Sequence, residues 1–302
     1  MRRYLYSILI GGTIVAGGMW VANTGGPVLE SSVAQASPIP KEDQYELDFH
    51  NAKTKGLNVR LKSALLVNFA DGSVLYAKNP DEVRSIASIS KLMTAMVVLD
   101  QKPDLTQIET ITKEDASRSS RSRMVVGYKL SLNDLLYTSL MVSDNRATRA
   151  LARAVFGSYE KCAAAMNAKA AELGLTNSHF VEPTGLSAEN VSTATEVAKI
   201  IYYTRNYSQI GKITSTQNYV TRIQRGKRLL KKPITNTNLL THSPYDVLTG
   251  KTGYISAAQY CVASLVQNRQ GERLTVVALG APGAMTRFRE ARKLVDWGFK
   301  QI

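Results

Sequence analysis

Cysteine and histidine are scarce in this sequence: its 302 residues include two cysteines and three histidines. Two cysteines cannot hold a disulfide-stapled mini-protein, and a chain of this length can bury a sizeable hydrophobic core. Cys162 lies in an alanine-rich stretch and Cys261 in an apolar one, so both are expected to be unpaired core residues. His50, His179 and His242 are isolated and belong to no HExxH motif or Cys/His cluster, so no metal site is expected.

The sequence also lacks a glycine-rich phosphate loop and a G-x-S-x-G motif, which argues against nucleotide-dependent chemistry and against an α/β-hydrolase. No motif implies a cofactor. Acidic residues are outnumbered, with 24 Asp and Glu against 38 Lys and Arg, which gives a net charge of +14. This basic excess leaves nucleic acid, an anionic membrane and an anionic cell wall open as partners.

The first residues indicate export from the cytoplasm. Arg2 and Arg3 precede an uncharged run over residues 4–21, which is the pattern of a signal peptide. The first small-x-small cleavage site, residues 34–36, lies well beyond that run, so residues 1–36 are expected to be a cleaved signal peptide or a retained membrane anchor. The protein is therefore expected to leave the cytoplasm, which makes nucleic acid an unexpected partner.

A polar segment with two prolines, residues 37–60, is expected to be a linker, and the folded domain is expected over residues 61–302. The domain opens with the pattern of a β-hairpin. Its strands are expected at residues 63–69 and 73–76, joined by Asp71-Gly72, a pair that favours a tight primed turn.

Helical and strand patterns follow in blocks. Residues 88–99 are apolar on nearly every face, which predicts a helix inside the core. Further helices are expected at residues 131–142, 159–173, 193–205 and 284–299. Residues 218–230 and 249–279 are rich in β-branched and aromatic residues, which predicts antiparallel strands.

This order of elements predicts an α+β fold. The N-terminal and C-terminal parts are expected to share one antiparallel sheet covered by helices, while the central helices form a second lobe. A cleft between a sheet edge and a helical lobe is where we expect the chemistry to lie.

Ser88 and Lys91 form an S-x-x-K motif at the start of the helix that is expected to be buried. Their spacing places a hydroxyl and an amine on one helix face, as a nucleophile and its base would lie. The pattern alone is weak, since Ser158 and Lys161 also match it, but this second match is expected in the middle of a polar helix. A lysine in a buried helix needs a reason, which favours Ser88 and Lys91.

Two tripeptides add to this motif. Ser143-Asp144-Asn145 separates two expected helices, and Lys251-Thr252-Gly253 opens an apolar strand. Residues 131–133 also match S-x-N, whereas Lys-Thr-Gly occurs once. The order of the three motifs and the context of each predict that they share one active site.

In these motifs the chain resembles the penicillin-recognising serine peptidases, which include low-molecular-mass penicillin-binding proteins and serine β-lactamases. Residues 84–96, 180–187 and 250–254 look like the D-alanyl-D-alanine endopeptidases of the penicillin-binding protein 7 type, and the likeness covers about residues 60–300. The resemblance implies a five-stranded antiparallel sheet with flanking helices beside an all-helical lobe. It also implies a serine DD-peptidase, in the periplasm or at the cell surface, that acts on peptidoglycan peptides through an acyl-enzyme and is inhibited by β-lactams.

The resemblance gives catalytic roles to four residues. Ser88 would attack the carbonyl of a D-alanyl peptide bond, and Lys91 would take its proton. An ordinary lysine is too basic for this task, so burial beside the cationic Lys251 is expected to favour the neutral form of Lys91. Ser143 would relay a proton to the leaving amine, and Asn145 would hold Lys91 and the substrate backbone.

The third motif would bind the substrate. Lys251 and Thr252 would hold a substrate carboxylate, and Gly253 would let the strand backbone approach the substrate. The backbone N–H groups of Ser88 and Tyr254 would form the oxyanion hole.

Three alternatives stay open. A D-alanyl-D-alanine carboxypeptidase shares these motifs, but such enzymes commonly carry a further C-terminal domain, whereas this chain stops after its closing helix. A β-lactamase needs a base for rapid deacylation, which Glu182 could supply. Glu182 is followed by Thr184-Gly185-Leu186 as in the peptidases, however, so we expect it to be a loop carboxylate.

The last alternative is a non-catalytic protein that binds an anionic cell wall or membrane. Two groups of cations support such contacts, namely Arg118, Arg121 and Arg123, and then Arg222, Arg225, Lys227, Arg228, Lys231 and Lys232.

Overall fold

The computed structural model describes residues 45–53, 57–117 and 122–302, which all belong to one compact unit. The expected signal peptide or anchor, residues 1–36, lies outside the described residues. Within the described ranges no helix is long and apolar enough to cross a membrane.

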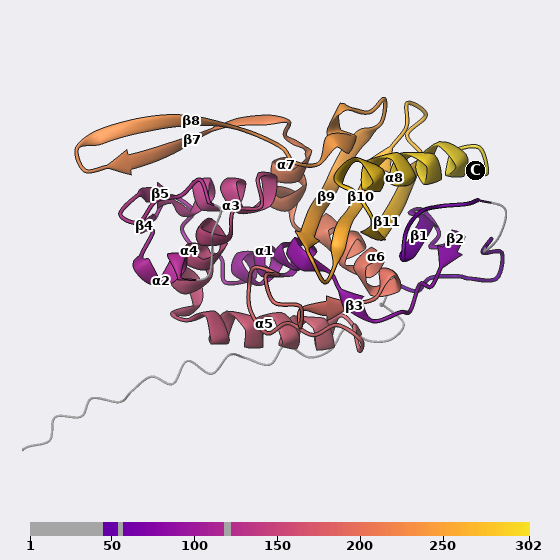
Figure 1. Cartoon of the computed structure of the whole chain (residues 1–302), viewed down its shortest axis with the longest axis horizontal. Coiled ribbons are helices and arrows are strands. Elements are labelled where there is room, and N and C mark those ends of the chain that lie inside the picture. Colours follow the sequence, from indigo (N-terminus) through magenta and orange to yellow (C-terminus); the bar gives the residue numbers. More distant parts are fainter. Residues whose placement is uncertain (1–44, 54–56, 118–121) are drawn as a thin grey trace, which may run out of the picture. The chain divides into compact units, whose positions relative to one another are not determined.

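The main sheet has five antiparallel strands in the order β2-β1-β11-β10-β9 (Figure 1). These strands are β1 (Ser63–Asn68), β2 (Val74–Lys78), β9 (Asp246–Ile255), β10 (Gln259–Gln267) and β11 (Arg273–Ala281). Strand β1 pairs with β11, so that Ser63 faces Leu279 across the sheet. The predicted sharing of one antiparallel sheet by the two ends of the domain is therefore confirmed.

Helices cover both faces of the main sheet. Helix α8 (Ala284–Gly298) packs on one face and α6 (Ala194–Tyr203) on the other. Because successive strand residues point to opposite faces, the neighbours Leu65 and Leu66 of β1 belong to different hydrophobic clusters. The cluster of Leu66 lies under α8, whereas that of Leu65 continues under α6 into the helical lobe.

The helical lobe follows β3 (Arg84–Ser85), which pairs with β6 (Val191–Ser192). Its helices are η2 (Ala87–Ser90), α1 (Lys91–Asp100), α2 (Lys113–Ala116), α3 (Leu132–Met141), α4 (Asn145–Phe156) and α5 (Tyr159–Glu172). Every residue of α1 from Lys91 to Val98 is buried, as its apolar character predicts. The lobe and the sheet together confirm the predicted α+β fold.

The strands predicted at residues 218–230 belong to a different sheet from the one expected. After η3 (Thr204–Asn206) and α7 (Ser208–Ser215), the chain forms the hairpin of β7 (Asn218–Arg225) and β8 (Arg228–Thr235), before η4 (Leu239–His242). The hairpin joins β4 (Ile108–Thr110) and β5 (Lys129–Ser131) in a four-stranded sheet of order β4-β5-β7-β8. A strand pattern carries no information about its partner, which here is β5 on the helical lobe (Figure 1).

Two local expectations also need correction. The β1–β2 loop spans four residues rather than a two-residue primed turn: the Ser73 carbonyl accepts from Asn68 N, and only Gly72 in the loop has a positive φ, of 77°. Ser158 is not in the middle of a helix. It caps α5, where its Oγ accepts a hydrogen bond from Lys161 N, so this second S-x-x-K is a helix cap.

The described part of the expected linker packs on the domain. The Tyr45 ring stacks on Tyr202 with centroids 3.6 Å apart, and the Tyr45 N–H donates to the Tyr203 hydroxyl. Elsewhere in the core, Cys162 and Cys261 are buried and unpaired, as predicted. Burial raises the pKa of both thiols, to about 12 and about 11, so neither is a reactive thiolate at neutral pH.

Candidate active site

Ser88 and Lys91 lie side by side at the junction of η2 and α1. Lys91 Nζ is 2.9 Å from Ser88 Oγ. Ala87, immediately before the serine, has a φ of 48°, in the left-handed region that costs a residue with a Cβ energy. This conformation persists because its surroundings fix it: the Ala87 carbonyl accepts from Ser90 Oγ at 2.8 Å, and the turn is closed by the Ile89 N–H bonded to the Ile86 carbonyl.

Two glycines allow the backbone to approach this turn. A Cβ on Gly185, whose φ is 75°, would lie 2.0 Å from the Ala87 carbonyl oxygen. A Cβ on Gly253 would lie 3.1 Å from Ser88 N and 2.9 Å from the Ile86 carbonyl oxygen. The glycine of the Lys-Thr-Gly motif is therefore needed for β9 to lie against the serine turn.

Lys91 makes two further contacts besides Ser88. Its Nζ lies 2.7 Å from Asn145 Oδ1 and 2.6 Å from the backbone carbonyl oxygen of Thr184. The lysine is 0% exposed. The amine is thus held by three oxygen atoms that come from three separate segments of the chain.

Burial lowers the pKa of Lys91 to about 7, and the nearby charge of Arg149 lowers it further, while the Glu182 and Asp144 carboxylates oppose this shift. Burial is the main cause of this shift, as expected. Lys91 and Lys251 disfavour each other's charged form, and Arg149 is a further cation that the sequence did not reveal. A lysine with this pKa is partly neutral at pH 7, as a general base must be.

Asp144, the middle residue of the second motif, positions its neighbours. It caps α4, where Oδ1 accepts hydrogen bonds from the N–H groups of Arg146 and Ala147, and this makes Asn145 the first residue of the helix. Ser143 lies between α3 and α4 with a φ of 58°. The loop thus presents Asn145 to Lys91 and places Ser143 two residues away along the chain.

The third motif lies on β9, next to the serine turn. Lys251 is 1% exposed, and its Nζ donates to the Thr252 carbonyl at 2.9 Å. Burial lowers the pKa of Lys251 well below its ordinary value, and the charges of Lys91 and Arg287 lower it further. Thr252 Oγ1 lies 2.8 Å from Thr237 Oγ1.

Tyr254 follows the motif at the exposed end of β9. Its side chain is half exposed and stacks on Tyr260, with ring centroids 4.2 Å apart. The carbonyl of the preceding Gly253 accepts a hydrogen bond from Arg287 Nη1 at 3.1 Å. The backbone of β9 is therefore fixed from the side opposite to Ser88.

Glu182 is a loop carboxylate, as predicted. Its two oxygens accept hydrogen bonds from the hydroxyl and the N–H of Thr184 and from the N–H groups of Leu186 and Ser187. These bonds shape the loop that brings the Thr184 carbonyl to Lys91.

Sequence reasoning missed the Thr184 carbonyl and Thr237. A backbone carbonyl leaves no residue-type signal, and Thr237 lies outside every motif. Thr237 connects the end of α3 to the third motif. Its N–H and its hydroxyl both donate to the Met141 carbonyl, and its Oγ1 lies within hydrogen-bond distance of Thr252 Oγ1. Within the described residues no group of three or more His, Cys, Asp or Glu side chains could hold a metal ion.

A serine hydroxyl in contact with a buried lysine of lowered pKa, set between an antiparallel sheet and a helical lobe, is the arrangement that covalent catalysis by an activated serine requires. The sequence profile of the D-alanyl-D-alanine carboxypeptidase family matches residues 50–283, and the chain belongs to this family.

Relatives with both endopeptidase and carboxypeptidase names resemble the chain. It is 37% identical over 240 residues to the D-alanyl-D-alanine endopeptidase of Escherichia coli (strain K12), covering 78% of this chain and 76% of that protein. The D-alanyl-D-alanine endopeptidase of Pseudomonas aeruginosa is 39% identical, with the same two coverages. The D-alanyl-D-alanine carboxypeptidase DacF of Bacillus subtilis is 31% identical, over 82% of this chain and 64% of that protein.

The fold agrees with these relatives. The crystal structure of the Streptomyces K15 DD-transpeptidase superposes with a TM-score of 0.76 at 27% identity, covering 82% of this chain and 100% of that one. The resemblance noted in the three motifs is thereby confirmed, and the chain is a serine DD-peptidase.

Proposed function

We propose that this enzyme is a D-alanyl-D-alanine endopeptidase that hydrolyses peptide cross-links of peptidoglycan through an acyl-enzyme on Ser88. The contacts of Lys91 carry the proposal. A neutral amine has two N–H groups and one lone pair. Asn145 Oδ1 and the Thr184 carbonyl can only accept, so they take the two N–H groups, and the lone pair faces Ser88 Oγ.

This arrangement assigns the first step. As Ser88 Oγ attacks the carbonyl carbon, its proton passes to the Lys91 lone pair, and the new C–O bond gives a tetrahedral oxyanion. The N–H groups of Ser88 and Tyr254 stabilise that oxyanion, which fits the close approach of Gly253 to Ser88 N. The Ala87 and Gly253 geometry holds the two donors in place before the reaction begins.

Collapse of the intermediate breaks the C–N bond. Ser143 relays the proton from Lys91 to the leaving amine, and Asn145 keeps Lys91 and the substrate backbone in place. Water then attacks the ester carbonyl while Lys91 again accepts a proton, which releases the acid and restores the Ser88 hydroxyl.

Lys251 and Thr252 bind a carboxylate of the substrate. Burial lowers the pKa of Lys251 in the free enzyme, so the ammonium form is costly there. A carboxylate next to Nζ favours that ammonium form, so a bound substrate carboxylate offsets the cost of burying the charge. Thr237 supports the site by fixing the Thr252 hydroxyl.

β-Lactams enter the same reaction, because attack of Ser88 on the lactam carbonyl opens the ring and leaves an ester on the serine. Rapid loss of this ester would need a second base near Ser88. The oxygens of Glu182 are already occupied by loop hydrogen bonds, so this carboxylate is not available as that base. A persistent adduct, and not β-lactamase turnover, is the expected result.

Carboxypeptidase action is the second candidate, because the matching family profile carries that description. The test uses a purified cross-linked muropeptide dimer and a monomer that ends in D-Ala-D-Ala, with products followed by mass. An endopeptidase converts the dimer to monomers and leaves the terminal D-Ala. Release of D-Ala from the monomer, with the dimer left intact, would replace the proposal by a carboxypeptidase.

We also infer export to the periplasm or the cell surface, with residues 1–36 as signal peptide or anchor, residues 37–60 as a linker whose described part packs on the domain, and residues 61–302 as the catalytic domain. Substrate and motifs support this, since peptidoglycan lies outside the cytoplasm. The mass of the protein recovered from cell fractions tests it. A chain that begins at Ser37 indicates cleavage, an intact chain in the membrane fraction indicates an anchor, and an intact chain in the cytoplasm contradicts the inference.

A further inference from the structure

The outer face of the four-stranded sheet is both cationic and apolar. Paired residues share a face of a sheet, and Gln224 of β7 pairs with both Leu229 of β8 and Lys129 of β5. Arg222 lies on this face as well, because it is two residues before Gln224 in β7. Ile108 also lies there, because it pairs with Ser131, which is two residues after Lys129 in β5. Leu229 is 64% exposed and Ile108 is 56% exposed, whereas Thr221 and Ile223 on the inner face are buried.

A cavity of about 650 Å³ opens on this face, between the sheet, the start of α3 and α7. Polar side chains line it beside the apolar ones, and some of their groups already bond within the lining, as Gln209 Nε2 does to Asn133 Oδ1 and the Tyr219 hydroxyl does to Asp134. These polar residues are Ser131, Asn133, Gln209, Tyr219 and Gln224. The cavity thus offers apolar contacts, amide groups and hydroxyl groups together, which is the mixture that a peptide chain requires.

Three cations border the cavity: Lys129, Lys212 and Arg222. Within the part of the chain that the structure describes, their side chains form no hydrogen bond and no ion pair. The one carboxylate in the lining, Asp134, is 5% exposed and accepts hydrogen bonds from Ser131 Oγ, the Tyr219 hydroxyl and the Arg222 N–H. That carboxylate is already satisfied, so the three cations remain available to an external anion.

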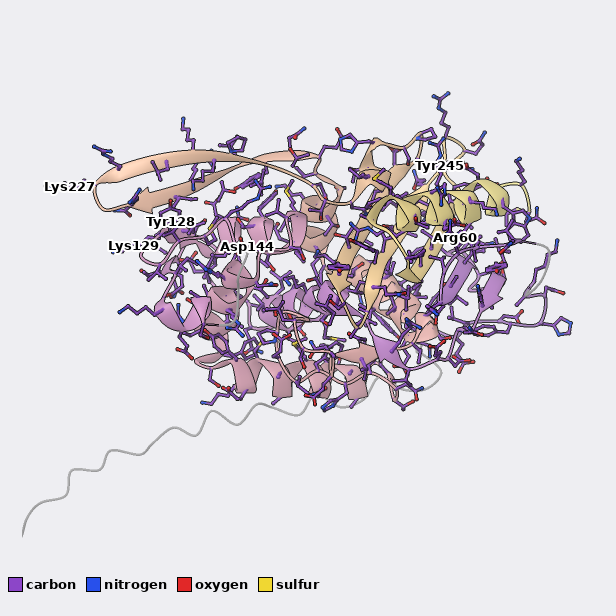
Figure 2. All side chains as sticks on the ribbon, in the orientation of Figure 1. Arg60, Tyr128, Lys129, Asp144, Lys227 and Tyr245 are labelled. Atoms are coloured by element: carbon purple, nitrogen blue, oxygen red, sulfur yellow. The ribbon has the colours of Figure 1, made fainter. Side chains whose placement is uncertain are left out.

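The surroundings strengthen this positive field. Residues 218–235, the whole β7–β8 hairpin, include no Asp or Glu but six Lys and Arg. Figure 2 shows Lys227 at the hairpin tip and Lys129 on the neighbouring strand β5, at the same end of the view. At physiological ionic strength charges act over about 8 Å, so these cations attract an acidic ligand that is already close.

We propose that this cavity is a second docking site for the substrate, which binds a carboxylate-bearing stem peptide of peptidoglycan outside the bond that is cleaved. The inference rests on the proposed function. Helix α3 begins at the cavity and ends two residues before Ser143, and its ten residues span about 15 Å. A cross-linked wall fragment is long enough to occupy the cavity and the Ser88 site together.

A stem peptide fits this cavity better than a membrane surface does. A lipid headgroup layer is flat and would meet the exposed hairpin without filling a concave pocket. A peptide carries both the backbone amides and the carboxylates that the lining can satisfy. The structure therefore favours a peptide ligand, and the membrane becomes an outcome of the test.

The experiment compares two double variants of the full chain that lose the same charge. Lys129→Gln/Arg222→Gln removes two cations at the cavity, whereas Lys161→Gln/Arg269→Gln removes two exposed cations from α5 and from the β10–β11 turn. Each protein is titrated onto insoluble sacculi, onto sacculi whose carboxylates have been amidated, and onto vesicles of anionic phospholipid. Thermal unfolding verifies that each variant is folded.

We expect the affinity for sacculi to fall about tenfold in the cavity variant and less than twofold in the control, since each exposed charge pair contributes modestly. The wild type should bind amidated sacculi as weakly as the cavity variant binds native ones. Equal losses in both variants, or unchanged binding by the cavity variant, would refute the site. Vesicle binding that depends on Lys129 and Arg222 and exceeds sacculus binding would assign the face to a membrane instead.

The benzylpenicillin adduct on Ser88 is measured for each protein in parallel. The ratio of peptide release from sacculi to the rate of acylation should fall in the cavity variant and not in the control. If the wild type forms no adduct, the proposed function has failed, whereas an adduct with an unchanged ratio means that only the docking site has failed.

Discussion

The pKa of Lys91 predicts how the acylation rate depends on pH. If neutral Lys91 is the base that accepts the Ser88 proton, the rate follows the neutral fraction of this lysine. With a pKa of about 7, half of the amine is neutral at pH 7. An ordinary lysine, with a pKa near 10.4, would be neutral in roughly 0.04% of molecules, so the buried site supplies roughly a thousandfold more free base.

The protonation state of Lys91 determines the direction in which the acylation rate changes with pH. Protonation removes the lone pair that faces Ser88, so acylation slows as the pH falls through 7 and slows about tenfold per unit well below it. Between pH 7 and pH 5 the rate constant for acylation should therefore fall about fiftyfold. The acid limb of the profile therefore reports on Lys91.

Fluorescent penicillin offers a direct assay of this limb, because its carboxylate stays ionised between pH 5 and pH 8. The second-order rate constant of acylation is measured for the wild type across that range, with Lys91→Ala as the control. The control should be folded and should not acylate at a measurable rate. Acylation that is independent of pH, or a Lys91→Ala protein that acylates at nearly the wild-type rate, would refute the assignment of the base.

Three further substitutions test how the site is built. Glu182→Gln removes a charge that raises the pKa of Lys91, so the acid limb of acylation should move to lower pH. The change also weakens loop hydrogen bonds, so urea unfolding should show a free energy of unfolding lower by about 1–3 kcal/mol. An unchanged or shorter lifetime of the penicillin adduct agrees with a loop carboxylate, whereas a much longer lifetime contradicts it. Gly185→Ala brings a Cβ against the Ala87 carbonyl, and it should lower the thermal midpoint and slow acylation together; an unperturbed enzyme would contradict the close packing. Thr237→Val removes the hydroxyl that bonds to the threonine of the Lys-Thr-Gly motif, so it should raise KM more than it lowers kcat. Equal effects on KM and kcat would argue against a binding role.

Much of the fold could be predicted because its signals are local. The apolar character of α1, the helix at the C-terminus and the strands at both ends of the domain follow from residue patterns, and each is found in the structure. The placement of the β7–β8 hairpin could not be predicted. The strands follow from their residue content, but their pairing with β5 joins segments that are far apart in the sequence.

In the active site, too, the residues could be predicted from local motifs, whereas some of their contacts could not. The order of the motifs predicted that Ser88, Lys91 and Asn145 share one site, and in the structure Lys91 contacts both of the others. The burial that lowers the pKa of Lys91 was expected from the sequence, whereas the nearby charge of Arg149 is revealed only by packing. The Thr184 carbonyl is a backbone group that any residue would supply, so it leaves no trace in composition or spacing.

The central claim is that Ser88 is the nucleophile of a penicillin-binding peptidase. The most direct test is to incubate the full chain with benzylpenicillin and follow its intact mass over hours, with Ser88→Ala as the control. The account predicts one adduct that persists, maps to Ser88 and is absent from the control. No adduct in the wild type, the same adduct on Ser88→Ala, or an adduct that disappears while penicillin is consumed would contradict it.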